Sequence, residues 1–180
     1  GCRLISGNVE IYKKMIDAYI ALQKSKEEIL AVIDEAIEVY PEEPTFTYCK
    51  GEIYLQDRKY EKADFYLNQA LVFAKKPRDA HSMDIFISYE KYLYICLGKL
   101  MLMKNHKDKA IGYFIDALQK GKYDKEIFLL FYQNLSALEA ADTIACVNTI
   151  YDVDIYDDLY FIMDALQYAK PSKVYLYYAR

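Results

Sequence analysis

The sequence has few of the residues from which common reactive sites are built. It contains no tryptophan, two histidines, four cysteines, six glycines and four prolines among 180 residues. The cysteines stand far apart with no C-x2-C pair, so neither a zinc site nor a disulfide framework is predicted. Free, buried thiols in a reducing cytosol are the expected state of Cys2, Cys49, Cys96 and Cys146.

The histidines and glycines lack the spacing of catalytic or nucleotide-binding motifs. His81 and His106 have no cysteine or aspartate at a useful distance for a metal site or a triad, and both are expected in surface turns. No G-x-G-x-x-G or G-x4-G-K segment is present to cradle a phosphate. The sequence therefore predicts no cofactor, no metal and no catalytic activity for this chain.

Long apolar runs and an excess of positive charge are also missing. No run approaches the roughly 20 apolar residues of a membrane span, and no secretory leader is visible, so we expect a cytoplasmic protein. The formal net charge is -4, and the basic residues are scattered among acids. This disfavours a nucleic-acid partner, because such proteins need clustered lysine and arginine.

Apolar residues, in contrast, are plentiful and recur at steps of three and four. The chain is 54% hydrophobic and 28% charged, which is typical of one globular domain, and the spacing predicts an all-α fold. Asn8 is expected to cap a first helix that runs to about residue 24. Ser25 and Glu28 form a capping box for a second helix, which Pro41 ends, and Pro44 suits the first turn of a third.

Two segments carry small residues at positions where neighbouring helices would meet. In YICLGKLM, at 94–101, Gly98 follows an aromatic residue and a leucine, and in AIGYFIDA, at 110–117, Ala110 and Ala117 flank a phenylalanine. This pattern resembles the tetratricopeptide repeat, a helix–turn–helix unit of about 34 residues. The resemblance implies stacked helical hairpins that form an α-α superhelix.

The length of the repeat is measured between the last alanines of successive units. Ala36 and Ala70 are 34 residues apart, whereas Ala117 follows only after an insertion at 78–90, which we interpret as a loop feeding a longer helix. The predicted units are about 10–43, 44–77 and 91–124. The second repeats the small-residue pattern at Gly51 and Ala63.

The remainder of the chain is expected to close the repeat array. A degenerate fourth unit is predicted at 125–152, with Asp142 capping its second helix. Capping helices follow at 155–180, and the last of them ends after two apolar turns. We infer from that ending that the sequence is a fragment of a longer protein, or that its end docks on a partner.

Helical-repeat proteins of this kind bind partners on the concave side, which the first helix of each hairpin lines. Side chains one turn apart on those helices are the candidate binding residues of a protein or peptide ligand. They are Lys14, Tyr48, Glu52, Leu55, Ile95, Lys99 and Leu102. Ala18 and Glu52 occupy places where a clamp for a ligand carboxylate would need polar donors, so that ligand is disfavoured.

Two further features have both a structural and a functional interpretation. Asp152-Val153-Asp154 has the spacing of a metal-binding Asp-x-Asp motif, but it joins two predicted helices and is expected to cap the second. Twenty tyrosines, mostly at helical spacing, are expected to pack in the core, although exposed ones favour interfaces.

The whole chain also resembles the helical-repeat region that follows the catalytic domain in certain bacterial family 2 glycosyltransferases. The segments that carry this resemblance are YEKADFYL at 60–67, KDKAIGYF at 107–114 and IYDVDIYDD at 150–158. The resemblance implies an alternative role as an accessory domain that positions the acceptor or mediates dimerisation. The catalytic domain would then lie upstream, as a partner of this one, and a homodimer is a further alternative.

Overall fold

The computed structural model describes residues 9–77, 80–135, 138–167 and 172–179, apart from the side chains at 80–85. Within these ranges the chain forms ten α-helices and no strand, which confirms the predicted all-α class. The helices are α1 Val9–Ala21, α2 Lys26–Val39, α3 Pro44–Gln56, α4 Tyr60–Ala74, α5 Ala80–Met103, α6 Lys107–Lys120, α7 Lys125–Asn134, α8 Ala140–Asn148, α9 Tyr156–Leu166 and α10 Lys173–Tyr178.

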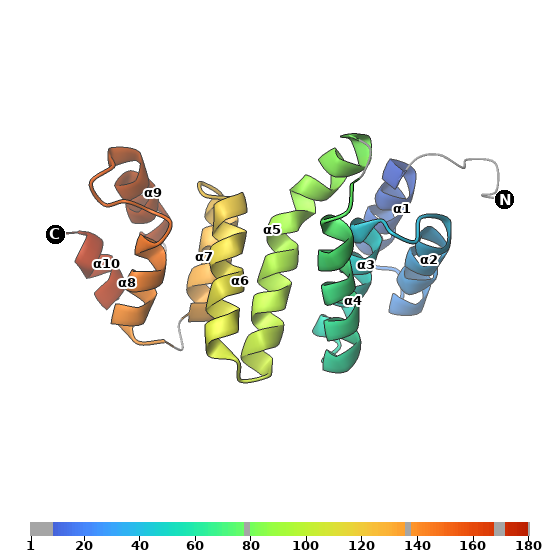
Figure 1. Ribbon diagram of the computed structural model, residues 1–180, viewed down its shortest axis with the longest axis horizontal. Coiled ribbons are helices and arrows are strands. Elements are labelled where there is room, and N and C mark those ends of the chain that lie inside the picture. Colours follow the sequence, from blue (N-terminus) through green and yellow to red (C-terminus); the bar gives the residue numbers. More distant parts are fainter. Residues whose placement is uncertain (1–8, 78–79, 136–137, 168–171, 180) are drawn as a thin grey trace.

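The helices are arranged along the long axis of the molecule, from α1 and α2 at one end, through α3 to α7, to α8, α9 and α10 at the other (Figure 1). Consecutive helices pack most closely within the pairs α3 and α4, and α5 and α6, while α1 packs on α2 and α4 packs on α5. Helix α7 contacts α5, α6 and α9, while α10 packs on α8 and α9 at the C-terminal end. The core is therefore a continuous layer shared between successive helices, as expected when each pair buries only part of its apolar surface alone.

Local sequence signals set several helix ends as predicted. The Ser25 side chain accepts a hydrogen bond from the Glu28 N–H, and the Glu28 carboxylate accepts one from the Ser25 N–H, which completes the capping box. Pro44 occupies the first turn of α3, and α2 ends before Pro41. The Asn8 cap lies outside the described residues.

Other boundaries differ from the prediction. From Ala80 onward the insertion is helical rather than a loop, because α5 begins there, and it buries Phe86 about two turns before Leu93. His81 consequently lies in a helix, whereas His106 is exposed in the turn before α6, as expected. The apolar residues in this segment continue the helical spacing of the rest of α5. This spacing outweighs the polar residues from which a loop was predicted.

Asp142 and Asp154, which the sequence predicts as helix caps, do not cap α8 and α9. Helix α8 begins after Glu139, which places Asp142 in its first turn, and α9 begins after Ile155 rather than Asp154. Neither Glu139 nor Ile155 makes a side-chain capping hydrogen bond. Asp142, in the first turn of α8, still interacts favourably with the helix dipole, which explains why it occurs near the predicted helix end.

The small residues lie where two helices come closest. A Cβ atom added to Gly98 of α5 would lie 2.3 Å from Phe114 Cε1 of α6, and one added to Gly51 of α3 would lie 2.8 Å from Leu67 Cγ of α4. Phe114 and Leu67 are themselves fully buried. These glycines therefore allow a contact that any larger residue would prevent, as the sequence pattern predicted.

Gly98→Ala should destabilise the protein by about 1–3 kcal/mol, because the buried Phe114 ring has to shift to admit the methyl group. Gly112→Ala is the matched control, because Gly112 lies in a helix of the same hairpin and has no neighbouring atom within 4 Å of its added Cβ. The control should stabilise the protein by up to ~0.8 kcal/mol through helix propensity. Urea unfolding measures both; equal stability of Gly98→Ala and the parent would contradict this packing.

Candidate binding groove

A cavity of about 400 Å³ opens between α3, α5 and α7, beside the turn from α3 to α4. It has apolar walls, two basic residues, one acidic residue and two side-chain amides. The lining residues are Glu52, Leu55, Gln56, Arg58, Tyr60, Cys96, Lys99, Met103 and Asn134. A concave, largely apolar surface with a few polar groups is the usual form of a ligand site.

Three of the seven predicted groove residues line this cavity, namely Glu52, Leu55 and Lys99. Glu52 and Leu55 come from α3, while Lys99 comes from α5, two helices further along the chain. The sequence assigned both helices to the concave side. The structure thus brings together side chains that are 47 residues apart in the sequence.

The other four predicted residues take different places. Tyr48 and Ile95 are buried in the core, and Leu102 is half-buried without lining the cavity. Lys14 points to solvent and forms an ion pair with Glu10, one turn earlier on α1.

On α1 the structure places Lys13, rather than Lys14, against the neighbouring helices. Lys13 is buried, forms an ion pair with Asp17, and holds its Nζ atom 4.6 Å from the centre of the Tyr89 ring of α5. The Tyr89 ring in turn contacts Tyr48 of α3, with 5.9 Å between ring centroids. The sequence does contain one signal that Lys13 faces the core, because residue 13 lies at helical spacing from Val9 and the apolar residues near it.

Several cavity residues had no signal in the sequence. Arg58 lies in a turn and has a left-handed backbone, with φ of 58°. Asn134 comes from the last turn of α7, where its side chain donates a hydrogen bond to the Leu130 carbonyl. Neither Arg58 nor Lys99 forms an ion pair with any described residue. Both therefore offer positive charge to whatever enters the cavity.

Partial burial dominates the electrostatics of Glu52. It raises the pKa of the Glu52 carboxyl above its ordinary value of 4.5, while a hydrogen bond with Tyr48 and the positive charge of Lys99 act in the opposite direction. Burial also raises the pKa of Tyr48. A polar group that is desolvated beside a specific charged neighbour, inside a cavity, is a common mark of a functional site.

The cysteines near the groove are not reactive. Burial raises the pKa of the Cys49 and Cys96 thiols to about 12, so both stay protonated at neutral pH. Both are free and buried, as is Cys146, which confirms the prediction for these three. Cys2 lies outside the described residues.

Glu52→Gln should stabilise the protein above the ordinary carboxyl pKa of 4.5 and leave its stability unchanged in stronger acid. A carboxyl whose folded-state pKa is raised favours folding in its protonated form, and this contribution is lost as the pH rises through the folded-state pKa. The amide stays neutral, so the gap between variant and parent opens above the ordinary pKa of 4.5 and grows with pH. Urea unfolding across this range measures it.

Glu38→Gln is the control for this pH series, because Glu38 is exposed and has no ion pair among the described residues. It should show no comparable gap at any pH. A Glu52→Gln variant that is less stable than the parent at pH 7 would mean that Tyr48 and Lys99 outweigh burial at this position.

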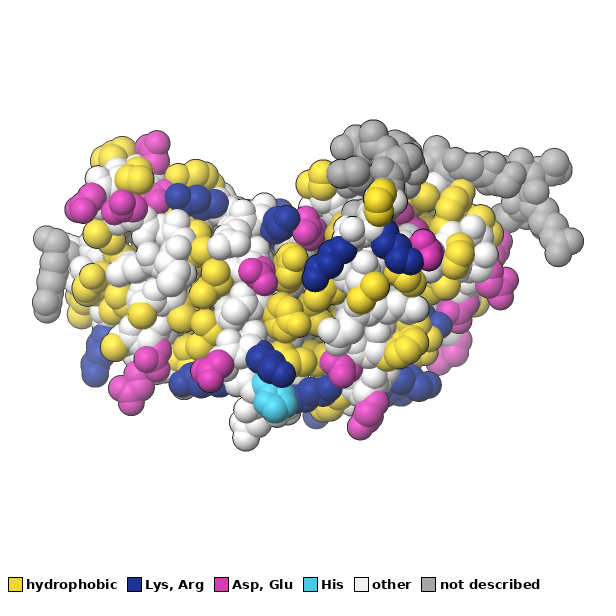
Figure 2. All heavy atoms as spheres, viewed as in Figure 1, with side chains coloured by type: hydrophobic (Ala, Val, Ile, Leu, Met, Phe, Trp, Pro, Cys, Tyr) yellow, Lys and Arg dark blue, Asp and Glu magenta, His cyan; other side chains and the backbone are white. Residues whose placement is uncertain are grey.

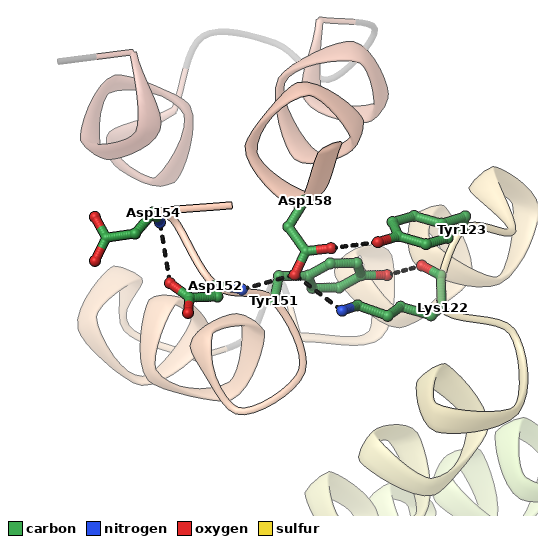
Figure 3. A network of polar contacts seen from close by, with 6 residues as sticks. All are labelled: Lys122, Tyr123, Tyr151, Asp152, Asp154 and Asp158. Carbon is green, nitrogen blue, oxygen red and sulfur yellow. Dashed lines mark hydrogen bonds and ion pairs between the residues drawn. The ribbon is translucent and has the colours of Figure 1, made fainter. Parts of the chain in front are cut away.

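The Asp-x-Asp segment takes part in a different polar network, between the α6–α7 turn and the α8–α9 turn (Figure 3). Its centre is Asp158, which is fully buried. The Asp158 carboxylate accepts hydrogen bonds from the Tyr123 hydroxyl at 2.6 Å, Lys122 Nζ at 2.9 Å and the Asp152 N–H at 2.9 Å. Asp152 itself accepts from the Asp154 N–H at 3.0 Å. The motif therefore shapes a turn that positions the buried aspartate.

These three donors keep Asp158 ionised. Burial acts to raise the pKa of its carboxyl, but the hydrogen bonds from Tyr123, the Asp152 N–H and Lys122 outweigh it and hold the pKa below the ordinary value of 3.8. The network joins the two turns further because the Tyr151 hydroxyl donates to the Lys122 carbonyl (Figure 3).

Asp158→Asn should destabilise the protein at neutral pH by about 1–3 kcal/mol, because charge-assisted hydrogen bonds to a buried carboxylate are lost. A lowered folded-state pKa contributes stability that is present above the ordinary pKa of 3.8 and lost as the pH falls below it. The gap between parent and variant should be constant from pH 7 to 5 and shrink in stronger acid. The neighbouring exposed residue provides a control, Asp157→Asn, which should cost far less.

Among the described residues, no group of three or more histidine, cysteine, aspartate or glutamate side chains is arranged to hold a metal ion. Likewise, no helix in the described part of the chain has the length and apolar character needed to cross a membrane. No protein-family model matches the sequence, and comparisons with curated proteins and with solved structures gave no match either.

Proposed function

We propose that this protein is a tetratricopeptide-like scaffold that binds an extended peptide segment of a protein partner in the groove between α3, α5 and α7. The observation that carries the proposal is the cavity of about 400 Å³, in which Lys99, Arg58 and Glu52 face apolar side chains. The alternation of apolar walls with charged groups suits a peptide, which presents side chains of both kinds along an extended backbone.

The close packing at the glycines supports the repeat architecture in this proposal. Gly51 and Gly98 occupy equivalent positions in the first helices of two successive hairpins, and each contacts a buried side chain of the second helix. Glu52 and Lys99 each follow one of these glycines by one residue, and both line the groove, which supports a repeated arrangement of α3 and α5.

In this proposal the described chain holds a partner and catalyses no reaction. The cysteines beside the groove remain thiols at neutral pH, which supports binding over nucleophilic chemistry. As an accessory domain of a glycosyltransferase, the chain would use the same groove for the acceptor polypeptide. This alternative role changes the ligand of the groove but not the residues that bind it.

The test is selection of peptides from a random library displayed on phage, followed by fluorescence anisotropy of the selected sequences with the full chain. Lys99→Ala should weaken binding about tenfold, because a charge-assisted contact inside the cavity is lost. Lys109→Ala is the matched control, since Lys109 is exposed on α6 and lies outside the cavity. Selected peptides that bind the Lys99→Ala and Lys109→Ala proteins equally well would place the binding site elsewhere.

A further inference from the structure

A second cavity, of about 330 Å³, lies between α9 and the turn that joins α6 to α7. Its lining residues are Tyr123, Asp157, Tyr160, Phe161 and Asp164. Asp157, Tyr160 and Asp164 follow one another at three- and four-residue steps, so they share one face of the helix. The Tyr123 ring comes from the turn before α7 and meets the Phe161 ring edge to face, with 5.6 Å between centroids. The cavity thus combines aromatic rings with two carboxylates.

The tyrosines around this cavity are unusually exposed. Tyr156 is 76% exposed and Tyr160 is 62% exposed, and their rings stack on each other with centroids 6.0 Å apart. Tyr123 is 55% exposed, although its hydroxyl is already bonded to Asp158. Most tyrosines of this chain are half-buried or buried, so packing does not account for these rings. Tyrosine gathered at one exposed place is typical of a contact surface.

The same corner of the molecule is locally acidic. Five aspartates and no basic residue occur between residues 152 and 164. Two of the five, Asp158 and Asp164, form ion pairs with Lys122 and Lys125. The other three have no ion pair with a described residue. They are Asp152, Asp154 and Asp157. Figure 2 shows acidic side chains gathered among hydrophobic ones at the upper left, over α9.

Aromatic rings of this chain already bind cations at this corner. Lys122 Nζ lies 5.4 Å from the centre of the Tyr123 ring and 5.7 Å from that of Tyr151. A cation over an aromatic face is attracted by the negative potential of the ring, and the attraction grows where carboxylates stand close by. The cavity beside Tyr160 also combines an aromatic ring with nearby carboxylates.

We propose that this surface binds a basic segment of a protein partner, with a lysine or arginine side chain entering the cavity between Tyr123 and Tyr160. Asp157, which has no ion pair with a described residue, neutralises the entering charge, while Tyr156 and the aspartates before it contact the neighbouring residues of the segment. Charge complementarity with the net-negative corner steers a basic segment to the site. The site is separate from the groove and does not depend on its occupant.

The test uses fluorescein-labelled octalysine and the full chain, with binding followed by fluorescence anisotropy at low ionic strength. Tyr160→Ala and Asp157→Asn should each weaken binding about two- to fivefold, which is the range expected for one exposed cation–ring or ion-pair contact. Tyr160→Phe should bind like the parent, because the ring and not the hydroxyl faces the cation. Added salt should weaken binding by every variant that retains the carboxylates.

Two matched variants separate this surface from a general effect of charge or exposure. Asp108→Asn removes an exposed carboxylate from the first turn of α6, just as Asp157→Asn does in α9, and Phe65→Ala removes a ring that is 62% exposed on α4. Both should bind like the parent. The proposal is overturned if octalysine does not bind, if Asp108→Asn weakens binding as much as Asp157→Asn, or if Tyr160→Ala binds as tightly as Tyr160→Phe.

Discussion

The close approach of paired helices at a residue without a side chain is the constraint on which this structure depends. At Gly98 and Gly51 the backbone of one helix lies against a buried side chain of the next, at distances that a Cβ atom would make impossible. The fully buried alanines of α4 and α6 extend the same contact along each hairpin. Glu52 and Lys99, the residues that follow these two glycines, both line the groove.

Polar contacts then connect one hairpin to the next at nearly constant sequence separation. Lys76 contacts Glu42 across 34 residues, and the Tyr92 hydroxyl contacts Glu126 across the same interval. Such exposed contacts contribute little to stability, so they do not hold the hairpins together. They favour one register between neighbouring hairpins, while the shared apolar core supplies the free energy of folding.

The sequence predicted the helices and the positions of their contacts better than it predicted the direction of single side chains. Helical spacing and the glycines are local signals, so the class of fold and the packing at Gly98 could be read directly. A shift of one residue rotates a side chain by about 100° around a helix, and this small difference separates Lys14, in solvent, from Lys13, in the core. The Asp158 network could not be predicted, because its donors come from turns that only the tertiary fold brings together.

Asp158 and Glu52 show how the same fold treats two carboxylates differently. Asp158 is fully buried, yet three donors satisfy it and lower its pKa, so it contributes to the folded structure and offers nothing to a ligand. Glu52 is less buried, yet its pKa is raised, because its hydrogen bond with Tyr48 and the charge of Lys99 do not compensate for its burial. A ligand that brings further N–H donors to Glu52 would complete that compensation, and peptide backbones carry such donors at every residue except proline. In the proposed function, the groove would therefore gain free energy when a partner binds, whereas the hydrogen bonds of the Asp158 network already form on folding.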